Sequence, residues 1–451
     1  MLNQQTSVRT EIIAGITTFV TMAYILFVNP STLATTGMDP NAVFIATCLG
    51  AGIVSIMMGL IVKAPIGLAP GMGLNAYFAV VAAPNGLMTW QTALAAVFIS
   101  GIIFLILTVT GFRQALVEAV PKSLQYAITV GIGLFIALLG FKLSGLIALQ
   151  AAPIPPTIES LQGGAPVTLL PFEWNLHLAS FEYFYGNSGL LAFIGLLITS
   201  ILMVRGIKGS ILIGIVISTL IGIPMGVTDL SSLQGASWFP DFSNTNFLAL
   251  DFKGVLGIGI LEVIFVFTFV ELFDTFGTMV ATMDRAGILK QPDGKKRLSK
   301  AMMVDASGVS IGALLGTSTI TAFVESSSGI EAGGRRGLTA ITIGVLFILA
   351  LFIAPLAGIV PSAATASALI IVGVLMMQNV VNIKFDDMLE AIPAFLTIVL
   401  MPLSQSIANG ISAGIIFYVI LGSLRGKKVH IIMWILAVVV VARYLFIGGE
   451  I

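Results

Sequence analysis

The segment PIGLAPGMGLNAYF, residues 65–78, decides the fold, because it interrupts an otherwise apolar part of the chain. It holds two prolines and three glycines within nine residues. A continuous lipid-facing helix through it would leave backbone groups without hydrogen-bond partners, which the bilayer interior does not tolerate. The pattern predicts an extended strand that meets a half-helix. A kink with a purely structural purpose is the alternative interpretation.

A second short, helix-breaking segment lies at the corresponding place in the other half of the chain. Shifting the sequence by 253 residues places residues 64–72 on residues 317–325. Paired interrupted segments in two halves are the pattern that best indicates a transporter binding site near the middle of the membrane. The half-helix N-termini near Gly73 and Ser326 would offer amide donors to a substrate, and Asn75 can pair with the polar edge of a ring.

The composition predicts a membrane protein. Hydrophobic residues make up 57% of the 451 residues and charged residues only 9%, whereas soluble domains carry about 25% charged residues. Hydrophobic runs of about 17 to 25 residues recur from residue 11 to residue 446, which is the length that a helix needs to cross a bilayer. We therefore expect a single multi-pass domain over residues 1–451, located in the cell membrane.

Several classes of function find no support in the sequence. Cys48 is the one cysteine, which excludes an internal disulfide and disfavours a thiol-metal site. His177 and His430 have no other metal-ligating residues near them in sequence. The chain has no GxxxxGK[ST] segment for ATP-driven pumping. These observations favour coupling to an ion gradient, with no cofactor and no nucleic-acid partner.

The apolar runs form two sets of seven, over residues 10–226 and residues 255–426. Because seven crossings is an odd number, the second set enters the membrane from the opposite side, which makes the two sets inverted repeats. The predicted fold class is an all-α polytopic membrane protein with about fourteen spans, of which the third and the tenth are broken. The extra apolar segment 430–447 either crosses the membrane once more or lies along its interface.

The distribution of positive charge predicts the orientation. Placing the N-terminus in the cytoplasm puts Arg113, the basic cluster at residues 285–300 and Lys428 on that same side, in agreement with the tendency of Lys and Arg to collect in cytoplasmic loops. The long loops at residues 150–188 and 227–257 then fall outside, and their charged residues are mainly acidic.

Three carboxylates lie in stretches that are otherwise apolar or small. Glu271 and Asp274 belong to IFVFTFVELFDTFGTMV, residues 264–280, and Glu325 belongs to TSTITAFVESSSGIEAGG, residues 317–334. A charged residue at the bilayer centre costs roughly 2.5 to 3.5 kcal/mol. We therefore expect these side chains to line a polar cavity.

Glu271, Asp274 and Thr278 follow one another at spacings of three and four, so they share one face of a helix. Two carboxylates one turn apart repel each other, which favours binding of a proton to the pair. We expect Glu271 and Asp274 to couple transport to protons, and Glu271 also to bind the substrate; a structural network with threonine and backbone groups is the alternative. Glu325 can accept two hydrogen bonds from adjacent donors on a heterocycle.

Four segments together resemble one family. They are TEIIAGITTFVTMAYILFVNP (10–30), GLAPGMGLNAYF (67–78), FTFVELFDTFGT (267–278) and FVESSSGIEAGGRRGLTA (323–340). In these segments the chain resembles the AzgA-type purine permeases, which are related to the nucleobase:cation symporter-2 family of nucleobase-ascorbate transporters. The resemblance implies fourteen spans divided into a core and a gate domain, and import of adenine, guanine or hypoxanthine by proton symport. It also implies a possible homodimer.

The resemblance assigns roles residue by residue. Glu271 and Asp274 match the acidic pair of the eighth helix, and Glu325 matches the purine-facing glutamate of the broken tenth. Gly73 and Asn75 match the motif of the third helix. More distant uracil-type relatives carry a histidine at the position of Thr275, so we assign proton coupling to Glu271 and Asp274 alone.

Other functions remain as alternatives. An inorganic anion transporter of sulfate or bicarbonate type would share the architecture, but acidic residues at the middle of the membrane argue against it. An intramembrane enzyme would need a nucleophile or a metal cluster beside the carboxylates, and the sequence provides neither. We therefore expect a transporter and no enzymatic activity. A channel is disfavoured because two broken helices in opposed halves suit a site with alternating access.

Overall fold

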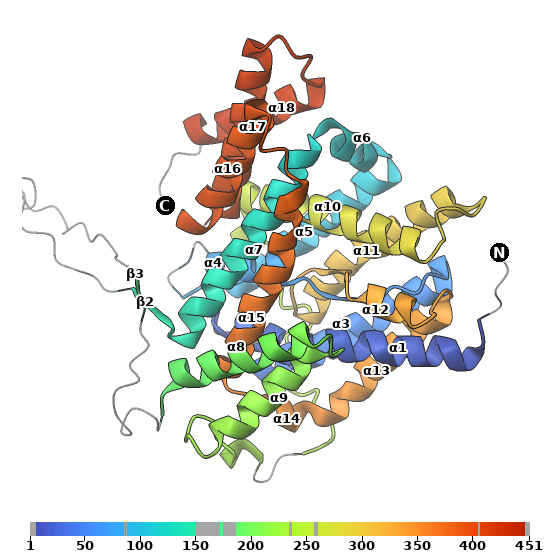
Figure 1. The fold of residues 1–451 in the computed structure, drawn as a ribbon, viewed down its shortest axis with the longest axis vertical. Coiled ribbons are helices and arrows are strands. Elements are labelled where there is room, and N and C mark those ends of the chain that lie inside the picture. Colours follow the sequence, from blue (N-terminus) through green and yellow to red (C-terminus); the bar gives the residue numbers. More distant parts are fainter. Residues whose placement is uncertain are drawn as a thin grey trace, which may run out of the picture.

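The computed structural model describes residues 6–84, 86, 88–149, 172–174, 186–233, 237–256, 260–404 and 406–446. This part of the chain is mostly helical (Figure 1). The elements of the first half are α1 (Val8–Met22), α2 (Ile25–Ala34), α3 (Pro40–Met57), β1 (Leu68–Pro70), α4 (Met72–Val81), α5 (Trp90–Val109), α6 (Phe112–Ala119), α7 (Lys122–Ser144), β2 (Ile147–Leu149), β3 (Phe172–Trp174), α8 (Ser188–Val204) and α9 (Ser210–Gly222).

The second half repeats the alternation of long helices with one short broken segment. Its elements are α10 (Ile260–Arg285), α11 (Gly294–Leu315), β4 (Ile320–Ala322), α12 (Ser326–Glu331), α13 (Gly337–Leu349), α14 (Ala354–Gly358), α15 (Ser362–Met377), α16 (Met388–Leu403), α17 (Ile407–Leu424) and α18 (Ile431–Phe446). Nine helical stretches of the described residues, with α1 and α2 counted together and α13 and α14 counted together, are long and apolar enough to cross a membrane. The helices α4, α8, α9, α16 and part of α18 are shorter and apolar. The predicted all-α, multi-pass fold class is confirmed.

Local sequence signals determine where several helices begin. Asp39 caps α3, because its Oδ1 accepts hydrogen bonds from the backbone N–H groups of Asn41 (2.8 Å) and Ala42 (2.9 Å), while Pro40 occupies the first helical position. Thr89 caps α5 in the same way. These signals fix the ends of apolar runs that have weak periodicity of their own.

The two broken segments cross as an antiparallel pair of short strands. Leu68 lies opposite Ala322, and Pro70 lies opposite Ile320. Beyond the ladder, the amide of Gly71 donates to the carbonyl of Thr319 at 2.9 Å. Each strand leads into a short helix, α4 or α12, as predicted for residues 65–78. Because the strands are antiparallel, both half-helices begin beside the crossing point, from opposite halves of the chain.

Helix contacts divide the described molecule into two bundles, which we call the core bundle (α1–α5 and α10–α14) and the gate bundle (α7–α9 and α15–α17). Within the core bundle, α3 packs on α13 and α5 packs on α11. Within the gate bundle, α7 packs on α15 and α16. The helix α6 connects the two, and α18 packs against α17 and α6. The core and gate division therefore follows directly from which helices pack together.

Close helix contacts depend on glycine. A Cβ atom at Gly344 of α13 would lie 2.5 Å from the carbonyl oxygen of Gly52 in α3, and a Cβ at Gly373 of α15 would lie 2.5 Å from that of Gly133 in α7. Both distances are far below van der Waals contact. Small residues allow helix backbones to approach closely in a membrane, where dispersion contacts replace the hydrophobic effect as the source of helix association.

The structure differs from the sequence predictions at three elements. Each apolar run of the two sets predicts one helix, but the run at residues 11–33 is divided into α1 and α2, and the run at residues 338–360 is divided into α13 and α14. The helix α6 was not predicted. Arg113 in α6 was assigned to the cytoplasmic loops, but its side chain is 1% exposed and buried within the protein. Most of the loop predicted at 150–188, and residue 447 of the last apolar segment, lie outside the described residues.

Candidate functional site

A cavity of about 630 Å³ lies between the two bundles, beside the crossing strands. The core side contributes the end of β1 and the start of α4, the end of β4 and the residues before α12, and one face of α10. The gate side contributes α7 and α15. The lining residues used below are Tyr24, Gly71, Met72, Gly73, Gln125, Tyr126, Thr129, Gly277, Thr278, Ala281, Arg285, Phe323, Glu325, Gln378, Asn379 and Asn382.

Glu325 lies in the wall of this cavity, as predicted from its charge in an apolar stretch. It immediately precedes α12 and is partly exposed. The hydroxyl of the buried Tyr24 donates a hydrogen bond to Glu325 Oε1 at 3.0 Å. This contact fixes one carboxylate oxygen against α2. Phe323, two residues earlier, adds an aromatic ring to the same wall.

The start of α4 faces the cavity through Met72 and Gly73. The first amides of a helix have no hydrogen-bond partner within the helix. The amides of this first turn can therefore donate hydrogen bonds to a molecule in the cavity. Gly73 leaves no room for a side chain, since a Cβ there would lie 2.8 Å from Ile132. The structure therefore places the predicted Gly73 beside Glu325 in one cavity.

Ser326 and Asn75 lie behind the cavity wall. Ser326 is fully buried; its amide donates to the carbonyl of Phe323 at 3.2 Å, and its hydroxyl oxygen accepts from the amide of Gly67 at 3.0 Å. Ser326 thus fastens α12 to the strand β1. Asn75 is also fully buried, and its side-chain amide donates to Asn29 Oδ1. Neither residue lines the cavity.

The helix α10 presents Gly277, Thr278, Ala281 and Arg285 to the cavity, at spacings typical of one helix face. Glu271 is 1% exposed and lies two turns deeper, outside the lining set. The predicted face of α10 therefore reaches the cavity through Thr278. The side chain of Asp274 lies outside the described part of the structure.

A buried ion pair lies between Glu271 and the crossing strands, and the sequence reasoning missed it. Arg113 Nη2 lies 3.4 Å from Asp305 Oδ2 and donates to Thr275 Oγ1 at 3.2 Å. Its guanidinium also lies 4.2 Å from the ring centre of Phe104. Asp305 Oδ1 accepts from the amide of Ala322 in β4 at 3.2 Å. The pair thus links α6, α10 and α11 to the strand β4 beside the cavity.

Polar residues of the gate side were also missed. Gln125, Tyr126 and Thr129 lie in the first two turns of α7, and Gln378 and Asn379 follow the end of α15. One sequence feature could have identified them: amide and hydroxyl side chains at the ends of apolar helices indicate a polar lining. Among the described residues, no group of three or more His, Cys, Asp or Glu side chains could hold a metal ion.

The comparisons with known proteins agree with this architecture. Residues 9–413 match the family model Xan_ur_permease, described as "Permease family". The chain belongs to this permease family. It is 42% identical to a guanine/hypoxanthine permease of Bacillus subtilis, over 98% of this chain and 97% of that protein. It is 40% identical to an adenine permease of Escherichia coli, over 99% of this chain and 94% of that protein.

The fold of this permease is shared with a solved transporter. The transmembrane domain of a cyanobacterium bicarbonate transporter superposes with a TM-score of 0.61 at 17% identity, covering 90% of this chain and 98% of that domain. The resemblance to purine permeases stated from the four motifs is confirmed by the sequence relatives. Membership of a permease family also indicates a transporter instead of an enzyme.

Proposed function

We propose that this permease imports a purine nucleobase together with a proton. The observation that carries the proposal is the placement of Glu325 and Phe323 beside the first turn of α4 in one cavity. A purine presents N–H donors and ring acceptors on its edges and a flat apolar face. A carboxylate accepts from the donors, backbone amides donate to the acceptors, and an aromatic ring packs on the face. The cavity volume of about 630 Å³ lies within the range of small-molecule sites.

The gate side completes recognition with neutral amides. Gln378 and Asn379 each carry both a donor and an acceptor, so they can match a purine edge without adding charge. Adenine differs from guanine and hypoxanthine in the donor and acceptor at one ring carbon. Which purine is preferred therefore depends on the side-chain orientation of a few such amides, and the names of the relatives include both adenine and guanine/hypoxanthine permeases.

The coupled proton is assigned to the pair of carboxylates on α10. Glu271 is buried near the Arg113 guanidinium, which interacts with it electrostatically. Asp274 lies one turn nearer the cavity along the same helix. Protonation of this pair would change the charge next to the crossing strands, and movement of the core bundle against the gate bundle would then alternate access. The proton is the proposed coupling ion, and no cofactor enters the cycle.

The orientation follows from charge. Basic residues follow the ends of α8, α10 and α17 and precede α7 and α13, and all of these ends fall on the predicted cytoplasmic side. The cavity is lined by Gln125 at the start of α7 and by Arg285 at the end of α10, which are two of these ends. We propose that the N-terminus is cytoplasmic and that the cavity opens inward. A homodimer is part of the proposal by family resemblance alone.

The test is uptake of labelled hypoxanthine into cells that lack their own purine permeases, at acidic and neutral external pH. Excess unlabelled adenine, guanine, uracil or sulfate serves as competitor. We expect saturable uptake that depends on the proton gradient and is blocked by purines. Blockage by sulfate and not by purines would instead assign an inorganic anion as substrate, which the fold shared with a bicarbonate transporter makes the second candidate.

Two variants separate binding from coupling. Glu325→Gln should weaken purine binding at least about tenfold, since one charge-assisted hydrogen bond contributes about 1.5–3 kcal/mol. Glu118→Gln is the matched control, because Glu118 is exposed and lies outside the cavity lining. Asp274→Asn should reduce gradient-driven uptake more than exchange of labelled for unlabelled purine. An equal loss of both activities would remove Asp274 from coupling.

A further inference from the structure

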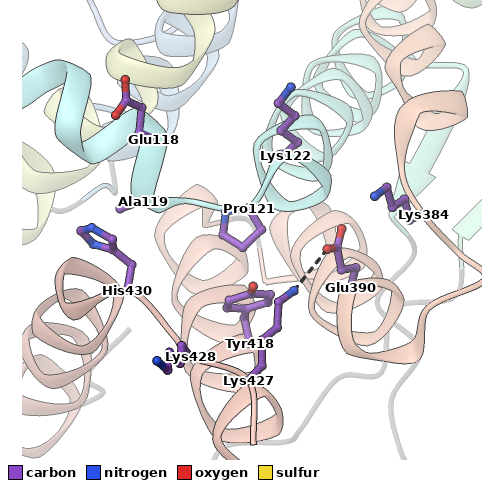
Figure 2. Close-up of a pocket in the computed structure, with 10 residues that line it drawn as sticks. All are labelled: Glu118, Ala119, Pro121, Lys122, Lys384, Glu390, Tyr418, Lys427, Lys428 and His430. Carbon is purple, nitrogen blue, oxygen red and sulfur yellow. Dashed lines mark ion pairs between the residues drawn. The ribbon is translucent and has the colours of Figure 1, made fainter. Parts of the chain in front are cut away.

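A second pocket, of about 310 Å³, has a lining that shares no residue with that of the purine cavity (Figure 2). It lies at the end of the molecule where α6, α17 and α18 meet (Figure 1). It is formed where α6 turns into α7 and where α17 turns into α18, with α16 beside them. Its lining consists of Glu118, Ala119, Pro121, Lys122, Lys384, Glu390, Tyr418, Lys427, Lys428 and His430. None of these residues takes part in the proposed transport cycle.

Positive charge exceeds negative charge in this pocket. Four lysines line it against two glutamates. Glu390 is already engaged, since it lies 3.7 Å from Lys427 Nζ (Figure 2). It also accepts a hydrogen bond from Ser123 Oγ. Among the described residues, Lys122, Lys384 and Lys428 form no ion pair. Three ammonium groups without an ion pair therefore line this pocket, and Glu118 is the one other carboxylate in its lining.

The remaining lysine is held in place as part of the pocket wall. The amino group of Lys427 lies 5.5 Å from the ring centre of Tyr418. Partial burial lowers the pKa of Lys427, but hydrogen bonding to Tyr418 and attraction to Glu390 and Asp387 outweigh this and raise it. Lys427 therefore stays charged at neutral pH. The excess of positive charge in the pocket therefore favours an anionic occupant.

The helix that follows the pocket identifies the source of that anion. Ile431, Trp434, Ile435 and Val438 are between 43% and 66% exposed. Their spacings of three and four place them on one face of α18, which starts directly after His430 of the pocket. In a membrane protein such a face contacts acyl chains, and a tryptophan one turn below the charged groups is typical of the interface. A free phosphate ion would contact the lysines but not this apolar face, whereas a phospholipid would contact both.

We propose that this pocket binds the phosphate headgroup of an anionic phospholipid, whose acyl chains lie along the exposed face of α18. Basic pockets between transmembrane helices on the cytoplasmic side are suited to such headgroups. The occupant would contact α6, which connects the core and gate bundles, and also α16–α18. The last apolar segment, which the fourteen-span fold leaves without a role, thereby gains one: it completes a lipid site.

The test uses the full-length protein, purified and delipidated in a mild detergent. Its melting temperature is followed while phosphatidylglycerol, phosphatidylcholine or inorganic phosphate is added. We expect phosphatidylglycerol to raise the melting temperature in a saturable way at concentrations where the other two have little effect. Equal stabilisation by phosphatidylcholine would overturn the proposal, because it would show no need for an anion. Equal stabilisation by inorganic phosphate would overturn the assignment to a lipid.

A charge-matched pair of variants locates the effect. The triple variant K122Q/K384Q/K428Q removes the three unpaired lysines of the pocket. The control K295Q/K296Q/K300Q removes three exposed lysines from the cluster at residues 285–300, on the same predicted side of the membrane. The phosphatidylglycerol midpoint should weaken at least about tenfold in the first and stay unchanged in the second. Equal weakening in both would reduce the effect to general surface charge.

Two further measurements keep the proposal testable if the triple variant does not fold. Lys428→Gln alone, at a position that is exposed in the structure, should weaken the midpoint severalfold. In native mass spectrometry, the wild-type protein should retain phosphatidylglycerol in preference to phosphatidylcholine at equal concentration, and Trp434→Ser should reduce that retention. Retention of both lipids in equal amounts would contradict the proposal without use of any variant.

Discussion

Arg113 and Asp305 are 1% and 0% exposed, and they form an ion pair inside a protein whose other long basic side chains mainly reach the surface. Burying two charges costs several kcal/mol for each ion, and their attraction offsets this only when both are present and further hydrogen bonds are made. Thr275, Met302 and Ala322 supply those hydrogen bonds. Removing one partner of the pair should therefore destabilise the protein more than removing both.

We predict that Asp305→Ala lowers the free energy of unfolding by about 3–5 kcal/mol, because it leaves the guanidinium of Arg113 buried without a counter-charge. The double variant R113M/D305L, which removes both charges, should recover a large part of this loss. The measurement is the melting temperature of the detergent-solubilised protein. A double variant that is less stable than Asp305→Ala would show that the ion pair itself holds the helices together.

Single residues could be predicted from sequence where the membrane imposes a rule. Glu325 had to face protein or water, because a carboxylate facing lipid is too costly, and it lines the cavity. Helical spacing predicted which face of α10 carries Glu271, but not its depth. Glu271 is buried and does not line the cavity. The partner of Asn75 is Asn29, 46 positions away. The burial of Arg113 depends on the path of α6. Neither this burial nor the contact between Asn75 and Asn29 is encoded by a local sequence pattern.

Helix contacts through glycine dominate at the scale of elements, and α13 provides a clear case. Gly344→Ala would place a methyl group 2.5 Å from the carbonyl oxygen of Gly52 and 2.7 Å from the side chain of Ile56. The first of these neighbours is backbone and cannot move without separating α3 from α13. We predict a loss of about 1–3 kcal/mol of stability, as for other overpacked interiors.

Gly277→Ala is the matched control, since a Cβ at Gly277 meets nothing within 4 Å and α10 is helical there. Its stability should rise by about 0.5–1 kcal/mol from the loss of backbone freedom in the unfolded chain. Both variants are compared by melting temperature in the same detergent. If Gly344→Ala were as stable as Gly277→Ala, close packing of α3 on α13 would not limit stability.

The start of α16 yields a pH prediction. Asp387 accepts a hydrogen bond from the amide of Leu389 at 3.1 Å and pairs with Arg425 after α17. These contacts, the amide first, lower the pKa of Asp387 below its ordinary value of 3.8. A lowered folded-state pKa means that the contribution to stability is present above that ordinary value and is lost as the pH falls through the folded-state pKa.

We therefore expect Asp387→Asn to melt at a lower temperature than the wild type by a constant margin between about pH 5 and pH 8. Below about pH 4 the margin should shrink, because the wild-type carboxyl becomes protonated and resembles the amide. Melting curves at a series of pH values give both margins. A margin that does not change down to pH 3 would assign the effect of the substitution to something other than the charge of Asp387.

The sequence predicted elements well where length and breaking residues define them. The long apolar runs became helices, and residues 65–78 became a strand followed by a half-helix. It failed for α6, since this helix is only eight residues long and its mixed polar and apolar composition resembles a loop between two apolar spans, although its apolar residues do follow helical periodicity. The pairing of β1 with β4 could not be read from either segment alone, because it joins the two halves of the chain.

At the scale of the whole molecule, the cavity between the bundles should be reachable from one side only. Gln378 lines the cavity and is exposed, and the one native cysteine, Cys48, is buried. We predict that Gln378→Cys reacts with a membrane-impermeant thiol reagent in inside-out vesicles and much more slowly in right-side-out vesicles. Hypoxanthine should slow the reaction. The wild type, with Cys48 alone, is the control, and faster labelling in right-side-out vesicles would reverse the proposed orientation.

The pairing of β1 with β4 also has a consequence for how the protein is made. Leu68 and Ala322 are 254 positions apart, and at about 5–20 residues per second a ribosome needs roughly 13 to 50 seconds to produce the partner. Until then the strand β1 can contact only residues of the first half. One of them is Ser55, whose hydroxyl accepts a hydrogen bond from the amide of Leu68 and donates one to its carbonyl. The cavity between the bundles is therefore among the last parts of the molecule to form during biosynthesis, and a nascent chain that stops before Ile320 contains neither this cavity nor a finished core.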